Sequence, residues 1–207
     1  MNKLRDTELI ITNSGRIYHL NLKKEEIADD IILVGDPNRV EQISNKFEKI
    51  DFKITHREFI THTGYYNNKK ISVISSGIGT DNIDIVMNEL DALANINSEK
   101  RQINKIKRSL NIIRLGTSGG LNKKIDVDSF LVSEYAIGLD GLAHFYKNND
   151  VLDEELSKMF FNKTNWSKNH ASPYSVKASN KLLNKFNNFS KGITLTATGF
   201  YGPQCRN

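Results

Sequence analysis

Cysteine and long apolar runs are both scarce in this sequence of 207 residues. Cys205 is the only cysteine, which excludes an intrachain disulfide and a zinc cluster built from cysteines. The longest unbroken apolar stretch near the start, Leu9 to Ile11, is too short for the core of a signal peptide. Nothing approaches the ~20 apolar residues of a membrane-spanning helix. We therefore expect a cytoplasmic protein that makes no contact with a membrane.

The excess of positive over negative charge is also small. The 29 lysines and arginines outnumber the 24 acidic residues, giving a net charge of +5 that is spread along the chain. The densest basic stretch lies in a predicted helix that has almost no aromatic residues to stack on bases, and it contains Lys100, Arg101, Lys105, Lys107 and Arg108. This pattern favours a solvated helical face over a nucleic-acid site.

Familiar catalytic signatures are missing as well. Ser76 to Thr80 follow a predicted strand and precede a predicted helix, as the glycine-rich turn of a dinucleotide-binding protein does. Asn82, however, stands where that turn needs its third glycine. The sequence contains neither a Walker segment nor an H-E-x-x-H segment. A Rossmann-type, NTPase or zinc protease activity therefore has no local support.

What the chain does have is short apolar runs alternating with helical patterns. The runs that predict strands are Ile31–Gly35, Thr55–Tyr66, Lys70–Ser75, Asn111–Leu115, Ser129–Ala136 and Ile193–Thr198. Asn67 and Asn68 tolerate left-handed backbone conformations, so they predict a hairpin between the second and third runs. Within the second run, alternation puts Arg57 and Phe59 on one face and His56 and Glu58 on the other.

Helical periodicity fills some of the gaps between these runs. An apolar face predicts a helix over 83–94, with Asp81 or Asn82 at its N-cap. Weaker patterns predict helices over Asp153–Phe161 and Val176–Phe186. Alternating strands and helices indicate an α/β fold, and the length suits one domain over 1–207 with a central sheet flanked by helices.

Two of the apolar runs end in small residues, and each has an arginine within it or shortly after it. One run continues into Gly35 and Arg39, and the other carries Arg114 and continues into Gly116 and Thr117. A buried strand that stops at glycine exposes backbone N–H groups, and ligands of α/β sheets bind beyond the carboxyl ends of the strands. These segments together predict a cradle for an anion.

The last polar segment offers a different chemistry. Gln204 supplies one acceptor and two donors, and Arg206 supplies a fork of donors. This set matches the edge of a uracil ring, and Phe200 is placed to stack on the ring face. The alternative from the residues alone is an exposed loop tip with solvated side chains. Arg57 and His19 likewise have an ordinary alternative, as a surface arginine and a packing histidine.

Five segments together resemble a known family. The sequences GDPNRV at 35–40, HREF at 56–59, SSGIG at 75–79, IRLGTSGG at 113–120 and FYGPQCR at 200–206 are similar to those of uridine phosphorylases, within the nucleoside phosphorylase superfamily. The segments occur in the family's order and extend over nearly the whole chain. The resemblance implies a mixed central sheet flanked by helices.

The resemblance also implies roles for individual residues. It implies a phosphate site with Arg57 reaching in from a neighbouring subunit, the full set being Gly35, Arg39, Arg57, Arg114 and Thr117. It implies that Phe200, Gln204 and Arg206 bind the pyrimidine and that His19 approaches the ribose of the partner's site. A partner-donated arginine and histidine require a homo-oligomer, at least a dimer.

No cofactor follows from the resemblance, and inorganic phosphate is the co-substrate. Glu58 and Ile78 match positions where some bacterial members hold a potassium ion between subunits, whereas Asn82 stands where those members have serine. No site for another metal is expected.

The expected activity is phosphorolysis of a pyrimidine nucleoside to free base and ribose 1-phosphate, with Arg114 and Arg206 as the catalytic residues. Family members continue well past the position of Asn207, so the expected domain is incomplete at its C-terminus. The alternatives are a non-catalytic remnant that binds phosphate or nucleoside or pairs with intact subunits, and a phosphate-independent nucleosidase. A general nucleic-acid binder ranks last.

Overall fold

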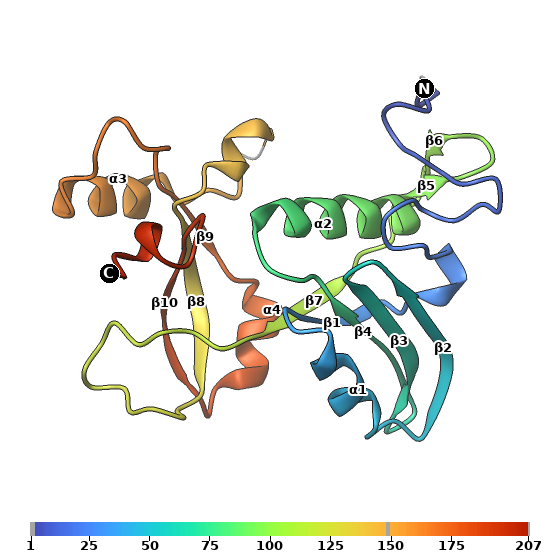
Figure 1. Ribbon diagram of the computed structural model, residues 1–207, viewed down its shortest axis with the longest axis horizontal. Coiled ribbons are helices and arrows are strands. Elements are labelled where there is room, and N and C mark those ends of the chain that lie inside the picture. Colours follow the sequence, from blue (N-terminus) through green and yellow to red (C-terminus); the bar gives the residue numbers. More distant parts are fainter. Residues whose placement is uncertain (1–2, 148–149, 207) are drawn as a thin grey trace. The chain divides into compact units, whose positions relative to one another are not determined.

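Strand β1 (Asp30–Val34) lies inside a five-stranded sheet, where it pairs in parallel on both sides. The structure, a computed structural model, describes residues 3–147 and 150–206 and consists of two units, 1–117 and 118–207 (Figure 1). In the first unit the strand order is β2-β3-β4-β1-β7, with β2 (Lys49–His56), β3 (Phe59–Tyr66), β4 (Lys69–Ser75) and β7 (Asn111–Leu115). Strands β2 and β3 are antiparallel to their neighbours, so the sheet is mixed.

Successive side chains of β1 point to opposite faces of this sheet, and each face packs against one helix. Ile31 and Leu33 belong to the core under α2 (Thr80–Asn95), which also contains Val86 and Leu90 of that helix. Val34 packs on the other face with Val40 of α1 (Asn38–Ser44). The uninterrupted apolar run of β1 is thus explained by burial on both faces.

The second unit contains a smaller sheet. Its order is β10-β8-β9, with β8 (Leu131–Gly138), β9 (Tyr174–Lys177) and β10 (Ser190–Thr196). Strand β10 is parallel to β8, whereas β9 is antiparallel. Helix α3 (Glu154–Lys163) is capped by Asp153, whose carboxylate accepts a hydrogen bond from the backbone N–H of Leu156 at 2.9 Å. Helix α4 (Asn180–Leu183) is a single turn.

Short elements complete the two units. Strands β5 (Ile96–Asn97) and β6 (Gln102–Ile103) pair with one another in the first unit. Single 3-10 turns occur at Lys24–Glu26, Leu142–Phe145, Asn184–Phe186 and Gly202–Gln204. Among the described residues, no helix combines the length and the apolar character needed to traverse a bilayer.

The structure confirms the predicted α/β class and the hairpin at Asn67 and Asn68, both of which have positive φ. It corrects one helix prediction and one predicted helix N-cap, and it adds a helix that was not predicted. The first two residues of the expected helix Val176–Phe186 belong instead to strand β9, because this segment completes the ladder beside β8. The N-cap of α2 is Gly79 rather than Asp81 or Asn82. Helix α1 was not predicted, since seven residues are too few for a clear periodicity.

The predicted strand Thr55–Tyr66 is wrong as a single element. It contains the last two residues of β2 and the whole of β3, which pair through His56 and Phe59, with the chain turning back at Arg57 and Glu58. Arg57 has a φ of 55°, a left-handed conformation that turns the chain. Arg57 and Phe59 therefore do not share one face of one strand, as simple alternation had placed them.

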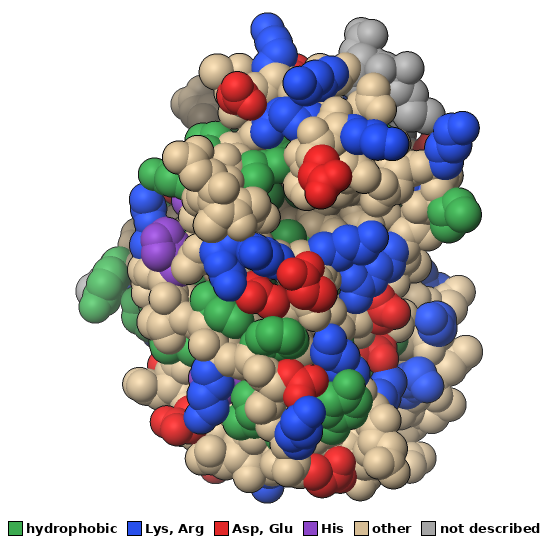
Figure 2. All heavy atoms as spheres, turned by 90° about the vertical axis from the view of Figure 1, so that its right-hand side faces the viewer, with side chains coloured by type: hydrophobic (Ala, Val, Ile, Leu, Met, Phe, Trp, Pro, Cys, Tyr) green, Lys and Arg blue, Asp and Glu red, His purple; other side chains and the backbone are tan. Residues whose placement is uncertain are grey.

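The basic stretch at 100–108 is also not a helix. Its arginines bind the backbone and two carboxylates. Arg101 donates to the carbonyl oxygens of Leu4 (2.9 Å) and Arg5 (2.7 Å) and pairs with Asp6 at 3.4 Å, and Arg108 pairs with Asp29. On the face shown in Figure 2, lysine and arginine side chains alternate with acidic ones rather than forming a field of one sign. The expected solvated helical face is therefore wrong as a helix, because this segment consists of strand β6 and irregular chain.

Gly64 has no room for a side chain. A Cβ atom there would meet the carbonyl oxygen of Lys49 and lie 2.8 Å from the ring of Phe47. Because one obstacle is backbone, Gly64→Ala should lower the free energy of unfolding by about 2–3 kcal/mol in denaturant titration. Gly120→Ala, which meets nothing within 4 Å, should change it by less than about 0.5 kcal/mol. Equal effects of the two substitutions would contradict this packing.

His62 is buried on β3, with its Nδ1 atom 2.7 Å from the Ser44 hydroxyl. Burial lowers the pKa of His62, and the positive charge of Lys53 acts in the same direction. The stabilisation from a neutral His62 is therefore complete above the ordinary histidine pKa of about 6.5 and is lost as the pH falls below it. We expect the unfolding free energy of His62→Gln to fall less between pH 7 and pH 5 than that of the parent chain. Parallel pH curves would refute this.

Candidate functional site

Three parallel strands, β4, β1 and β7, end level with one another, so their carboxyl ends form one end of the larger sheet. This end is called the carboxyl edge below. The register pairs Val34 of β1 with Ser75 of β4 and with Leu115 of β7. The β2–β3 turn lies at the same edge because β3 runs antiparallel to β4. All the residues predicted to bind phosphate therefore belong to segments at this edge, namely Gly35, Arg39, Arg57, Arg114 and Thr117.

Arg114 lies across the ends of β1 and β7. Its Nη2 atom is 3.4 Å from the point where a Cβ atom of Gly35 would stand, and its Nη1 atom is 2.5 Å from the same point at Gly116. Glycine at both positions leaves space for the guanidinium. Within residues 3–147 and 150–206, neither Arg114 nor Arg39 makes a side-chain hydrogen bond or an ion pair. Both cations are therefore free to bind an anion.

Arg57 lies at the same carboxyl edge but far from Arg114 along it. The β2–β3 turn that carries Arg57 is at one end of the strand order, and β7 is at the other. Its guanidinium stacks on the ring of Tyr18, 5.4 Å from the ring centroid, and donates to the Tyr18 hydroxyl at 3.4 Å. His19 follows directly and packs edge-on against Tyr18. The structure thus brings together Arg57 and His19, the two residues expected to reach a neighbouring subunit, and separates Arg57 from Arg114.

The residues predicted to bind the base form a cluster of their own in the second unit. Gln204 Oε1 accepts hydrogen bonds from Nε and Nη2 of Arg206, each at 3.3 Å. The Arg206 guanidinium lies 4.2 Å from the centroid of the Phe200 ring. All three side chains are exposed, so their donors and the ring are accessible to a ligand.

The positions implied for potassium were tested on their contacts. Nδ2 of Asn82 donates to Oε1 of Glu58 at 3.2 Å, and the Ile78 side chain is 94% exposed. An amide N–H directed at the carboxylate is a donor, not a cation ligand. The described residues contain no group of three or more histidine, cysteine or acidic side chains arranged for a metal ion. These residues do not fit a cation as they are placed, and no chemical step is assigned to one.

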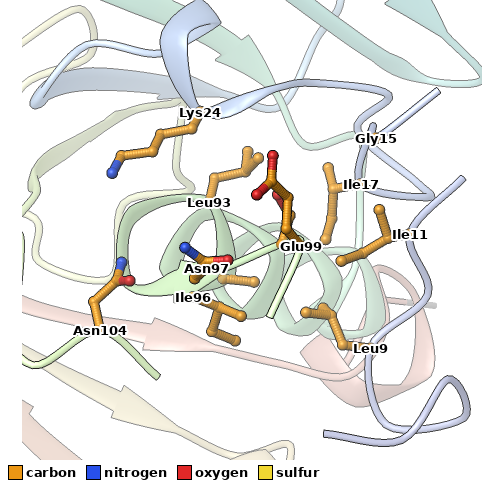
Figure 3. Close-up of a pocket in the computed structure, with 12 residues that line it drawn as sticks. Leu9, Ile11, Gly15, Ile17, Lys24, Leu93, Ile96, Asn97, Glu99 and Asn104 are labelled. Atoms are coloured by element: carbon orange, nitrogen blue, oxygen red, sulfur yellow. The ribbon is translucent and has the colours of Figure 1, made fainter. Parts of the chain in front are cut away.

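Two other features of the chain resemble functional sites. Residues 116–120 spell G-x-S-x-G, the pattern of a hydrolase nucleophile elbow, but that turn requires a helix directly after it. The next described element is strand β8, and the Ser118 hydroxyl donates to Gly119 O at 3.3 Å. A cavity of about 240 Å³ lies beside the C-terminal end of α2 (Figure 3). Leu9, Ile17 and Leu93 line its apolar part, and Lys24 and Glu99 lie at its polar side. None of the predicted site residues lines this cavity.

The fold is that of an α/β protein of the nucleoside phosphorylase type. Comparison with known proteins agrees. Residues 29–206 match the family model of the Phosphorylase superfamily. The chain is 31% identical over 135 residues to a uridine phosphorylase of Thermococcus kodakarensis, which is 65% of this chain and 44% of that protein. It is 32% identical over 132 residues to a uridine phosphorylase of Haemophilus influenzae, 63% of this chain and 47% of that protein.

A solved structure shows the same fold at higher coverage. The crystal structure of a Trypanosoma brucei nucleoside phosphorylase, described as showing uridine phosphorylase activity, superposes with a TM-score of 0.83 and 29% identity. The superposition covers 96% of this chain and 72% of that one. The chain belongs to the Phosphorylase superfamily, and its resemblance to uridine phosphorylases is confirmed. The matched part spans less than half the length of the two curated relatives.

Two free arginines at the strand ends predict that phosphate stabilises the fold. At a phosphate concentration 100 times its dissociation constant, the free energy of unfolding should rise by about 2.7 kcal/mol. Arg114→Gln should abolish most of this rise in a thermal melt. Arg108→Gln is the matched control, because Arg108 pairs with Asp29 at the opposite edge of the sheet. A melting temperature independent of phosphate would refute the cradle.

Proposed function

We propose that this chain catalyses the phosphorolysis of uridine or a closely related pyrimidine nucleoside, yielding the free base and ribose 1-phosphate. The observation that carries the proposal is the cluster of Phe200, Gln204 and Arg206, whose donors, acceptor and ring match one pyrimidine. The kinship with uridine phosphorylases supports it. The nucleophile is inorganic phosphate.

The phosphate is held at the carboxyl edge of the larger sheet. Gly35 and Thr117 supply the small residues beside the strand ends, and Arg39 and Arg114 supply charge. Arg57 of the neighbouring copy completes the set, which agrees with its position on Tyr18, away from its own Arg114. Charge-assisted hydrogen bonds from three guanidinium groups orient one phosphate oxygen for attack.

In the reaction, that oxygen forms a bond to the anomeric carbon of the ribose while the bond from this carbon to the base nitrogen breaks. The electron pair of the broken bond leaves with the base, so negative charge develops on the uracil ring. Arg206 and Gln204 donate hydrogen bonds to this charge, which is larger in the transition state than in the bound substrate. The mechanism needs no general acid from the protein, because the departing anion is stabilised directly.

His19 of the neighbouring copy contacts the ribose in this proposal. Shared residues make the enzyme a homo-oligomer of at least two chains, and we place it in the cytoplasm. The substrates are small molecules, uridine and phosphate, without a cofactor. The same exposed side chains also allow a second function, the binding of phosphate or nucleoside without turnover.

One assay separates these functions. Uracil release from uridine should require phosphate and produce ribose 1-phosphate in equal amount. Release without phosphate would instead indicate a nucleosidase, and binding of uridine without any release would indicate the non-catalytic function.

Arg206→Leu should lower kcat/KM for uridine about 100-fold, since one charge-assisted donor to the developing anion contributes about 3 kcal/mol. The fold should be unaffected because Arg206 is exposed. Lys191→Leu, an exposed cation of β10, is the control and should leave the rate unchanged. A normal rate for Arg206→Leu would refute the proposed role in base binding.

A further inference from the structure

Glu89 is a buried carboxylate on α2 that the proposed reaction does not use. Only 7% of the residue is exposed, and a buried charge is costly unless hydrogen bonds compensate it. The compensation comes from one short loop. Glu89 Oε1 accepts from the backbone N–H of His19 at 2.9 Å, and Oε2 accepts from that of Leu20 at 2.7 Å.

The same carboxylate also contacts the His19 ring. Its Oε1 atom lies 2.7 Å from Nδ1 of His19. An ionised carboxylate only accepts hydrogen bonds, so Nδ1 carries the ring proton at this contact. In the neutral ring this leaves Nε2 as an acceptor, and Nε2 has no hydrogen-bond partner among residues 3–147 and 150–206. The ring is partly exposed, with 29% of the side chain accessible, so Nε2 can reach a ligand.

The loop is held from a second direction. Nδ1 of His56, at the end of β2, donates to the backbone carbonyl of His19 at 2.8 Å. His19 is thus fixed through its N–H, its C=O and one ring nitrogen, while its other ring nitrogen stays free. A histidine that only packs between elements does not need this arrangement.

We propose that Glu89 is a positioning residue, which fixes the tautomer and the orientation of His19 so that Nε2 accepts a hydrogen bond from a ribose hydroxyl in the partner's site. This inference rests on the proposed function for the role of His19. Carboxylates that orient histidine ligands in metal sites work in the same way, and their loss typically costs about 10- to 100-fold. The competing explanation is that Glu89 only caps the backbone of residues 19 and 20.

The tautomer is measured directly by nitrogen-15 NMR of the histidine rings, with His19 assigned from the spectrum of His19→Ala. The parent chain should show His19 protonated at Nδ1 at a pH where the ring is neutral. Glu89→Gln should shift the ring toward the Nε2-protonated form, whereas Asp91→Asn, which removes an exposed carboxylate from the same helix, should not. An Nε2-protonated ring in the parent chain overturns the proposal, even if Glu89→Gln fails to fold.

Kinetics then separate positioning from capping. In the parent background, Glu89→Gln should raise KM for uridine about tenfold or more, with a smaller change in kcat. In a His19→Ala background the same substitution should have no further effect on KM, because its action passes through the ring. Equal losses in both backgrounds overturn the proposal in favour of capping. Absence of phosphorolysis in the parent chain refutes the proposed function and not this inference. The double-mutant cycle is then measured on the dissociation constant for uridine. A loss in the parent background alone supports positioning, and equal losses in both backgrounds overturn it.

Discussion

The in-register parallel pairing of β1 with both β4 and β7 is the constraint on which the rest of the site depends. Val34, Ser75 and Leu115 are paired in register, so the three strands end side by side. The loops that follow them are therefore close together. The apolar run of β1 is buried on both faces by α1 and α2, so this register cannot slip without exposing core side chains. Packing energy of the sheet therefore fixes where Arg114 lies relative to Gly35.

Most of this architecture could be predicted from residues that serve both the fold and the site. The apolar runs ending at Gly35 and before Gly116 indicated strand ends, and the paired asparagines at 67 and 68 indicated a hairpin. The short spacing of Phe200, Gln204 and Arg206 was enough to predict their cluster, since a single 3-10 turn connects them. Local sequence determines each of these features, and distant contacts do not compete with it.

Features that depend on distant contacts could not be predicted. Residues 174–177 form a strand because β8 offers an unpaired edge, which helical periodicity does not reveal. Glu89 is 70 residues from His19, so its role has no signal in one sequence beyond an acidic residue on the inward face of a helix. Tyr18 was missed for the same reason, although its place beside His19 was a hint that the two rings act with Arg57.

Two tight turns of the larger sheet need residues with a left-handed backbone conformation, and the chain uses different residue types in them. At the β3–β4 hairpin it uses asparagines, which adopt left-handed conformations at little cost, whereas at the β2–β3 turn it uses Arg57, a residue for which that conformation costs on the order of 1 kcal/mol. Glycine there would relax the backbone and remove the guanidinium. Under the proposed function, position 57 is thus a point where backbone stability is exchanged for a phosphate-binding guanidinium, and sequences released from selection for that function should drift there toward glycine or asparagine first.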